Sequence, residues 1–183
     1  PLMLIVSACL AGFPCRYDGK KEINPDVQQL VREGKAIPVC PEQLGGLPTP
    51  RSAAEIKAGK VINTDGDDVT EAFEKGAAVV LEIAQQYGCT DALLKARSPS
   101  CGKGLVYDGT FSGILTAGNG KTADLLMKNG ITVMTEEEWS DIDLPFRAAR
   151  RCASIPYLGA NTIAQAKKND SVKMIQAPVA PFR

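Results

Sequence analysis

Short apolar runs recur along the chain, and each has the length of a β-strand. Between them lie stretches whose apolar residues repeat at helical spacing, or loops rich in Gly and Pro. Because strands that alternate with helices form parallel sheets, this order predicts one α/β domain. We expect a small, doubly wound, mostly parallel sheet, Rossmann-like, with helices on both faces. The predicted strands cover residues 4–8, 37–39, 91–95 and 131–134.

Start and stop signals set the ends of the predicted helices. Asn24 before Pro25 resembles an N-cap followed by Pro at the first helical position. The helix that they open should run to about residue 33, where Gly34 ends it. Apolar residues at helical spacing predict a longer helix over 68–87. Further helices are predicted over 122–128 and, from the capping box in 135–138, at the end of the domain.

Hairpins and a proline-rich loop are expected between these elements. The stretch 60–66 should form a small hairpin or turn, and 105–113 a hairpin that turns at Asp108-Gly109. The loop 47–51 is rigid because of its prolines. It either covers a site, with Arg51 reaching in, or has only a structural role.

Length and charge narrow the function classes. The 183 residues suit one domain, placed at 3–143, followed by an irregular C-terminal tail at 144–183. Lys plus Arg and Asp plus Glu both number 21, so no overall basic character indicates nucleic-acid binding. The apolar run at 4–6 is far too short for a signal peptide or a membrane span. We therefore expect a cytoplasmic protein without membrane contact.

The sequence contains six cysteines and no histidine. Without a signal peptide, six cysteines favour metal binding or catalysis over a disulfide framework. Cys9, Cys40 and Cys101 each follow a predicted strand. If these strands are parallel neighbours, their thiols gather at the carboxyl edge of the sheet, where open α/β sheets hold ligands. Three convergent thiols suit a metal or an iron–sulfur cluster, although ordinary packing explains buried cysteines equally well.

The remaining candidates surround these positions. Cys15 lies in the first loop and could supply a fourth thiolate, whereas Cys89 and Cys152 are expected to be structural. Glu42 places a carboxylate two residues after the second of the three thiols. Arg16 either orients a polar ligand or forms a surface ion pair.

A series of motifs runs in order through residues 3–139. They are Ser7-Ala-Cys9-Leu, Cys15-Arg-Tyr-Asp-Gly19, Ile37-Pro-Val-Cys40-Pro-Glu42-Gln-Leu-Gly-Gly-Leu-Pro-Thr-Pro50-Arg, Asp68-Val-Thr-Glu-Ala-Phe73, Ser98-Pro-Ser-Cys101-Gly and Tyr107-Asp-Gly-Thr-Phe-Ser-Gly113. Together these motifs resemble the thiouracil desulfidase family, and the resemblance does not extend into the tail. It implies a [4Fe–4S] cluster held by Cys9, Cys40 and Cys101, with one open iron that has no protein ligand. The implied activity removes sulfur from a small thiolated pyrimidine, 2-thiouracil or also 4-thiouracil, giving uracil and sulfide without net redox change.

Proximity to the motif cysteines suggests the other roles. Glu42 and Ser100 are the predicted catalytic residues, with Glu42 carrying a proton between water and product. Ser98 and Arg16 are the predicted substrate-binding residues. A hydroxyl of either serine could hydrogen-bond the substrate ring or its sulfur.

Two other function classes remain open at this point. The first is an RNA-binding module, stabilised by zinc or a cluster, that docks thiolated tRNA through the tail at 144–183. The neutral charge count argues against it, because phosphate contacts need a Lys- or Arg-rich surface. The second is a cluster-free sulfurtransferase that carries sulfur as a persulfide on one cysteine.

Overall fold

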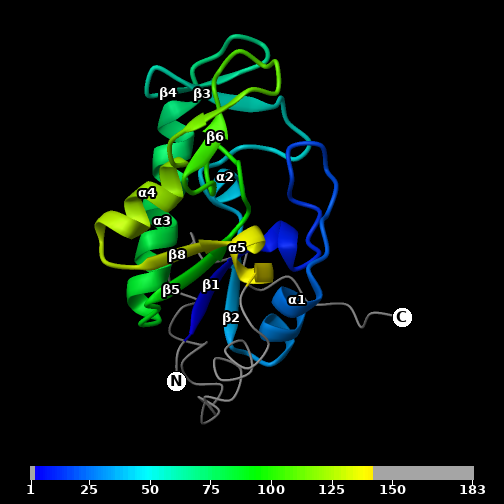
Figure 1. The fold of residues 1–183 in the computed structure, drawn as a ribbon, viewed down its shortest axis with the longest axis vertical. Helices are drawn as coiled ribbons and strands as arrows, with labels where there is room; N and C mark the ends of the chain where they lie inside the picture. The colour runs from blue at the N-terminus through cyan, green and yellow to red at the C-terminus, as the bar shows by residue number, and fades with distance from the viewer. Residues whose placement is uncertain (1–2, 142–183) are drawn as a thin grey trace.

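The computed structural model describes residues 3–141, and a parallel four-stranded sheet forms their centre (Figure 1). The strands stand in the order β2-β1-β5-β8. The chain leaves β1 toward β2 on one side and later returns through β5 to β8 on the other. This reversal between β1 and β5 opens a crevice at their carboxyl ends, where such folds bind ligands. The strands are β1 (Leu4–Ser7), β2 (Ala36–Val39), β5 (Asp91–Leu94) and β8 (Thr132–Thr135).

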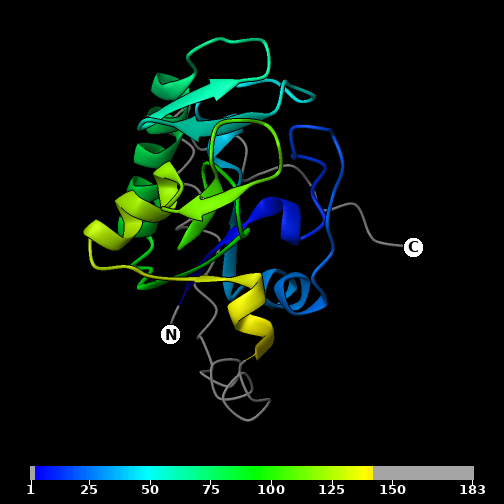
Figure 2. The same cartoon turned by 45° about the horizontal axis from the view of Figure 1, so that its top comes forward.

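Helices cover both faces of this sheet, which confirms the predicted doubly wound α/β class (Figures 1 and 2). Every residue of β1 is buried, as expected for a strand covered on both sides. Leu4 and Val6 belong to one apolar cluster, and Ile5 belongs to the other, because successive side chains of a strand point to opposite faces. The helices are α1 (Pro25–Arg32) and α5 (Glu136–Asp141) on the first face, and α3 (Thr70–Gln86) and α4 (Lys121–Lys128) on the second.

Side-chain caps fix where two of these helices begin. The Asn24 side chain accepts hydrogen bonds from the backbone N–H groups of Asp26 at 3.1 Å and Val27 at 3.2 Å. At α5, the N–H of Glu138 donates to Thr135 Oγ1 at 3.2 Å, and the N–H of Thr135 donates to Glu138 Oε2 at 2.8 Å. Both predicted helix starts are confirmed.

Two β-hairpins lie beyond the carboxyl edge of the sheet (Figure 2). β3 (Ala54–Lys57) pairs with β4 (Lys60–Asn63), and β6 (Leu105–Tyr107) pairs with β7 (Leu115–Ala117). The hairpin or turn expected at 60–66 is only part of the first hairpin. Its turn lies earlier, at Ala58-Gly59, where φ is 47° and 81°.

The turn predicted at Asp108-Gly109 is wrong, because the loop between β6 and β7 is longer and runs to residue 114. Glu55 explains this difference. Its Oε2 accepts hydrogen bonds from the N–H groups of Gly109 and Phe111, each at 3.0 Å, and so holds the loop against β3. This contact joins the two hairpins into one wall above the sheet.

A short helix, α2 (Pro41–Leu44), follows β2 directly and packs against α3. Pro41 at the first helical position and the acidic side chain after it favour a helix start at this point. The two helices approach at Gly45 and Gly76. A Cβ on Gly76 would lie 1.9 Å from the Pro41 carbonyl oxygen, and one on Gly45 would lie 2.0 Å from that of Ala72. Glycine at both positions therefore fixes the place of α2.

The predicted domain at 3–143 extends two residues past the described part. The predicted tail at 144–183 and Cys152 lie outside the described residues. Within 3–141, none of the helices combines the length and the apolar character that crossing a membrane requires.

Candidate metal centre and active site

A cavity of about 460 Å³ lies at the carboxyl edge of the sheet. The ends of β1, β2 and β5 form its base, and the loop after β1 and both hairpins contribute to its walls. Cys9, Cys40 and Cys101 all line it, as the positions of their strands predicted. Cys15, whose place the sequence left open, lines the same cavity. Soft sulfur donors from three connections, those that follow β1, β2 and β5, therefore surround one space.

Each of the three predicted ligands stands where regular structure ends. Cys9 lies in a 3₁₀ turn immediately after β1, and Cys40 is the N-cap of α2 with an extended backbone. Cys101 lies in the loop after β5, where its N–H donates to Ser98 Oγ at 3.1 Å. The parallel sheet brings these three turns to one edge, although about 90 residues of sequence separate the first from the last.

The thiols differ in how readily they lose a proton. Hydrogen bonds with Cys40 and Cys9, together with burial, raise the pKa of Cys15. The hydrogen bond from Cys15 lowers the pKa of Cys40, which favours the thiolate there. Burial raises the pKa of Cys101, and it raises the pKa of Cys89, which lies outside the cavity, to about 11. Cys89 packs in the apolar cluster on the α3 face of the sheet, as expected for a structural cysteine.

The metal donors around this cavity are mainly thiols, because the sequence contains no His. Cysteine thiolates are the ligands that hold iron–sulfur clusters. Among residues 3–141, no three His, Cys, Asp or Glu side chains form a group that could hold a single metal ion. Three or four thiols around one cavity therefore fit an iron–sulfur cluster.

Glu42 lies at the start of α2 and is held by Arg51. Arg51 Nε and Nη2 both lie 2.6 Å from Glu42 Oε2. The two side chains are only 7% and 16% exposed, Arg51 being the more buried. The proline loop therefore does bring Arg51 into the site, where it meets the predicted proton carrier.

Hydrogen bonds hold the Arg51 guanidinium on several sides. Besides the contacts with Glu42, Nη2 donates to the Cys15 carbonyl at 3.0 Å, and Nη1 donates to the Pro48 carbonyl and to Thr49 Oγ1, each at 3.1 Å. All three guanidinium nitrogens therefore have partners within the protein. Arg51 thus ties together α2, the proline loop and the loop that carries Cys15.

The two predicted serines have different surroundings. Ser98 lines the cavity, and its Oγ accepts hydrogen bonds from the N–H groups of Ser100 and Cys101, each at 3.1 Å. Within the described residues its own O–H has no acceptor, so it can donate into the cavity. Ser100 requires a correction: it is fully buried, and its hydroxyl pairs with Thr122 Oγ1 at 3.0 Å. That pair packs the Cys101 loop against α4, and Ser100 is not part of the cavity wall.

Arg16 lines the cavity, and it is also paired, so both interpretations of this residue apply. Its Nε lies 3.2 Å from Asp18 Oδ1, and its Nη1 lies 3.0 Å from Glu22 Oε2. Lys95, which sequence reasoning missed, lines the same wall and pairs with Glu22 at 3.4 Å and with Glu136. Burial lowers the pKa of Lys95, but the hydrogen bond and charge of Glu136 raise it by more. Its place directly after β5 was the signal that could have found it.

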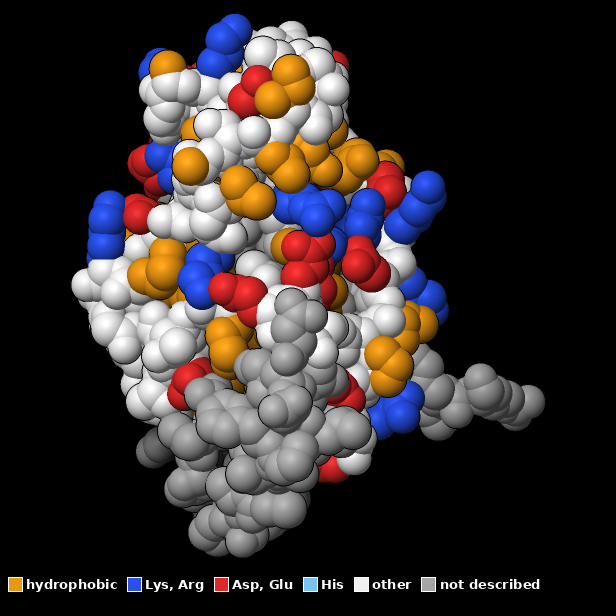
Figure 3. Space-filling model, in the orientation of Figure 1, with side chains coloured by type: hydrophobic (Ala, Val, Ile, Leu, Met, Phe, Trp, Pro, Cys, Tyr) orange, Lys and Arg blue, Asp and Glu red, His pale blue; other side chains and the backbone are white. Residues whose placement is uncertain are grey.

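The charges on this face of the molecule are mixed. Figure 3 shows Lys and Arg side chains beside Asp and Glu near the middle of the face, with hydrophobic side chains above them. Neither sign dominates the visible described surface. This arrangement agrees with the equal charge counts of the sequence.

Comparison with known proteins gives a consistent family and fold. A family model for 2-thiouracil desulfurase matches residues 4–138. The Bacillus subtilis (strain 168) protein YbbK, described as uncharacterised, is 43% identical over 150 residues, which cover 76% of this chain and 99% of YbbK. The structure of the [4Fe-4S]-dependent thiouracil desulfidase TudS is similar with a TM-score of 0.75 and 42% identity. The structural match covers 84% of this chain and 100% of the TudS chain.

Proposed function

The chain belongs to the 2-thiouracil desulfurase family, and on this premise we propose that it hydrolyses the C–S bond of small thiolated pyrimidines. The proposed substrates are 2-thiouracil and, second, 4-thiouracil, and the products are uracil and sulfide. The observation that carries this proposal is the gathering of thiols, Glu42 and Ser98 around one cavity. The iron–sulfur dependence of the similar TudS supports it.

The cluster, in this proposal, is a [4Fe–4S] group held by Cys9, Cys40 and Cys101. These three thiols follow three parallel strands of the sheet, so a rigid scaffold fixes their positions. When bound, such a cluster supplies a soft Lewis acid at its open iron, suited to the sulfur of the substrate. Cys15 lies beside Cys9 and Cys40. The iron content of a Cys15→Ala variant tests whether this thiol is a fourth ligand.

The protein's own chemistry is then proton transfer at Glu42. Water loses a proton to the carboxylate and attacks the ring carbon that carries sulfur. The C–S bond breaks, sulfur leaves as sulfide, and the proton returns from Glu42, so no electrons are gained or lost. Arg51 binds Oε2 and thereby leaves Oε1 for water. The ion pair fixes the direction from which the proton is taken.

The remaining wall residues orient the substrate. The Ser98 O–H can donate to a ring carbonyl or to the substrate sulfur, and its two accepted hydrogen bonds hold it in place. Arg16 and Lys95 line the same cavity, and their carboxylate partners restrain their side chains. A neutral pyrimidine suits such a wall, because it needs hydrogen bonds and no net charge.

Anaerobic purification followed by an assay of sulfide release tests this function. We expect a brown protein with roughly four irons per chain after reconstitution, as a cubane cluster requires. Incubation with 2-thiouracil should release equal amounts of uracil and sulfide. Equal activity in an iron-free preparation would overturn the proposal, and mass spectrometry that finds sulfur bound to one cysteine would replace it with the persulfide mechanism.

A further inference from the structure

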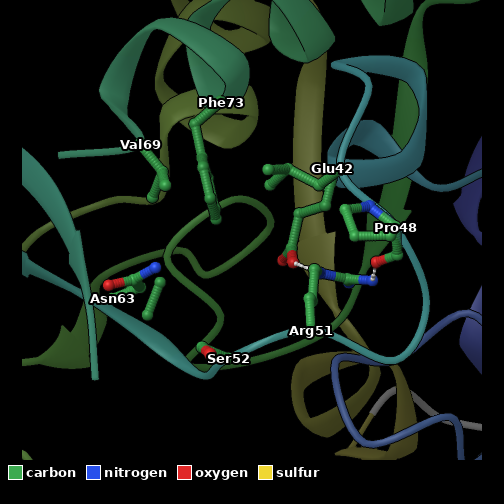
Figure 4. A pocket seen from close by; sticks show the side chains of 9 residues that line it. Glu42, Pro48, Arg51, Ser52, Asn63, Val69 and Phe73 are labelled. Carbon is green, nitrogen blue, oxygen red and sulfur yellow. Dashed lines mark hydrogen bonds and ion pairs between the residues drawn. The ribbon is translucent and has the colours of Figure 1, made fainter. Parts of the chain in front are cut away.

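A second, smaller cavity of about 270 Å³ adjoins the thiol cavity. The two cavities share Glu42, Arg51 and Ala54, so the ion pair forms part of the wall between them. In Figure 4, Glu42 and Arg51 lie along one side of the small cavity, and Val69 and Phe73 project from the other. Its lining is Glu42, Leu47, Pro48, Arg51, Ser52, Ala54, Asn63, Val69 and Phe73.

The polar side chains around this cavity are mostly satisfied by the protein itself. Asn63 Oδ1 accepts the N–H groups of Asp65 at 3.0 Å and Asp67 at 2.8 Å, and Ser52 Oγ donates to Asp65. All three guanidinium nitrogens of Arg51 have protein partners. The guanidinium is therefore poorly placed to bind a further anion, and the Glu42 charge is already paired with it. An ionic small-molecule effector has little here to bind.

Glu42 Oε1 is the exception. Both Arg51 contacts go to Oε2, and within residues 3–141 no hydrogen bond to Oε1 is formed. The Glu42 side chain is only 16% exposed. A carboxylate oxygen in such surroundings needs a donor, because an unsatisfied buried polar atom is strongly unfavourable. The cavity has room for several water molecules, and a water molecule there could donate to Glu42 Oε1.

We propose that the small cavity is a water site that delivers the reacting water to Glu42 from behind the substrate. This inference rests on the proposed function. A pyrimidine ring in the thiol cavity displaces the water that enters by the same opening. Water on the other side of the ion pair stays next to Glu42 Oε1 and can replace each molecule that reacts. The apolar side chains of Val69 and Phe73 hold this water weakly, so it exchanges easily.

Filling the cavity without touching Glu42 or the thiols tests the proposal. Val69→Phe adds a ring on the side opposite the ion pair, and Val69→Leu is a smaller filling variant if the first does not fold. Turnover should fall at least about tenfold, which is less than the ~10²–10⁴-fold expected for loss of the general base itself. KM for 2-thiouracil and iron per chain should stay at wild-type values. Val79→Phe is the matched control, since it makes the same change within α3, whose N-cap is Val69, and lies outside both cavities.

A crystal structure gives a second readout that does not depend on activity. Wild-type protein should show ordered water within hydrogen-bonding distance of Glu42 Oε1, and Val69→Phe should lose it while the ion pair stays in place. A dry cavity in the wild-type protein, or filling variants with unchanged turnover, would overturn this inference and leave the proposed function intact. A wild-type protein that releases no sulfide would overturn the proposed function and this inference with it.

Discussion

Replacing Arg51 with Met removes the cation that holds Glu42 but keeps a long apolar side chain. The structure decides the size of the effect, because the two side chains are 7% and 16% exposed. A surface ion pair contributes about 0–1 kcal/mol, whereas breaking a buried pair and leaving one charge behind costs about 3–5 kcal/mol. The carbonyls of Cys15 and Pro48 also lose their donor. We therefore expect Arg51→Met to lower the free energy of unfolding by about 3–5 kcal/mol.

Urea and thermal unfolding of the reconstituted protein measure this change. For a chain of this size, each kcal/mol shifts Tm by about 2–4 °C, so Tm should fall by roughly 6–20 °C. Arg51→Lys should be intermediate, because lysine has three N–H donors where arginine has five. The double variant Glu42→Gln with Arg51→Met should recover part of the loss, since no charge is then left without a partner. A loss below about 1 kcal/mol in Arg51→Met would show that the pair behaves as a surface pair, and the reasoning would fail.

The other predictions concern proton transfer, the ligands and the contact between α2 and α3. Glu42→Gln should keep iron content and colour while turnover falls by about 10²–10⁴-fold, and full activity per iron in that variant would remove Glu42 from the mechanism. Loss of any one ligand thiol should abolish both iron binding and activity, measured by absorbance and sulfide release, whereas Cys89→Ala should change neither. The ligand variants are Cys9→Ala, Cys40→Ala and Cys101→Ala. Cys15→Ala should keep its colour and iron, and bleaching would mean four protein ligands and no open iron. Gly76→Ala should lower the unfolding free energy by about 1–3 kcal/mol by overpacking, although Ala in a helix is intrinsically favoured by about 1 kcal/mol. The reason is that a Cβ added at Gly76 would lie 1.9 Å from the Pro41 carbonyl oxygen. An increase in Tm for this variant would contradict that reasoning.

The sequence predicted the layered part of the fold well, and the physical reason is local. The strands of the sheet are short apolar runs, and the helices begin at caps such as Asn24 that act within three residues. The gathering of thiols followed from the parallel order of these elements. The first hairpin was recognised only in part, because Glu55 is buried in β3 where an apolar residue would be expected. Its partners are backbone N–H groups more than 50 residues away, which no local pattern reveals.

The site was predictable in its residue types but not in its orientations. Ser98 and Ser100 are equivalent by sequence, yet one faces the cavity and the other pairs with Thr122. The turn after β5 decides between them, and its geometry depends on contacts with α4. Arg51 could be expected to reach the site, but its set of partners depends on α2 and two loops meeting there. Lys95 was missed because a single lysine after a strand carries no distinctive spacing.

The close backbone contact between α2 and α3 also has a mechanical consequence. Backbone meets backbone at Gly45 and Gly76, with no side chain between them to change rotamer. Helix α2 consequently cannot slide or tilt along α3 without a clash, and Glu42 moves only as α3 moves. Any opening that admits a pyrimidine must therefore leave α2 in place against α3. Hydrogen exchange should be slow at the α2 and α3 amides, so that the proton carrier keeps its position while substrate enters and product leaves.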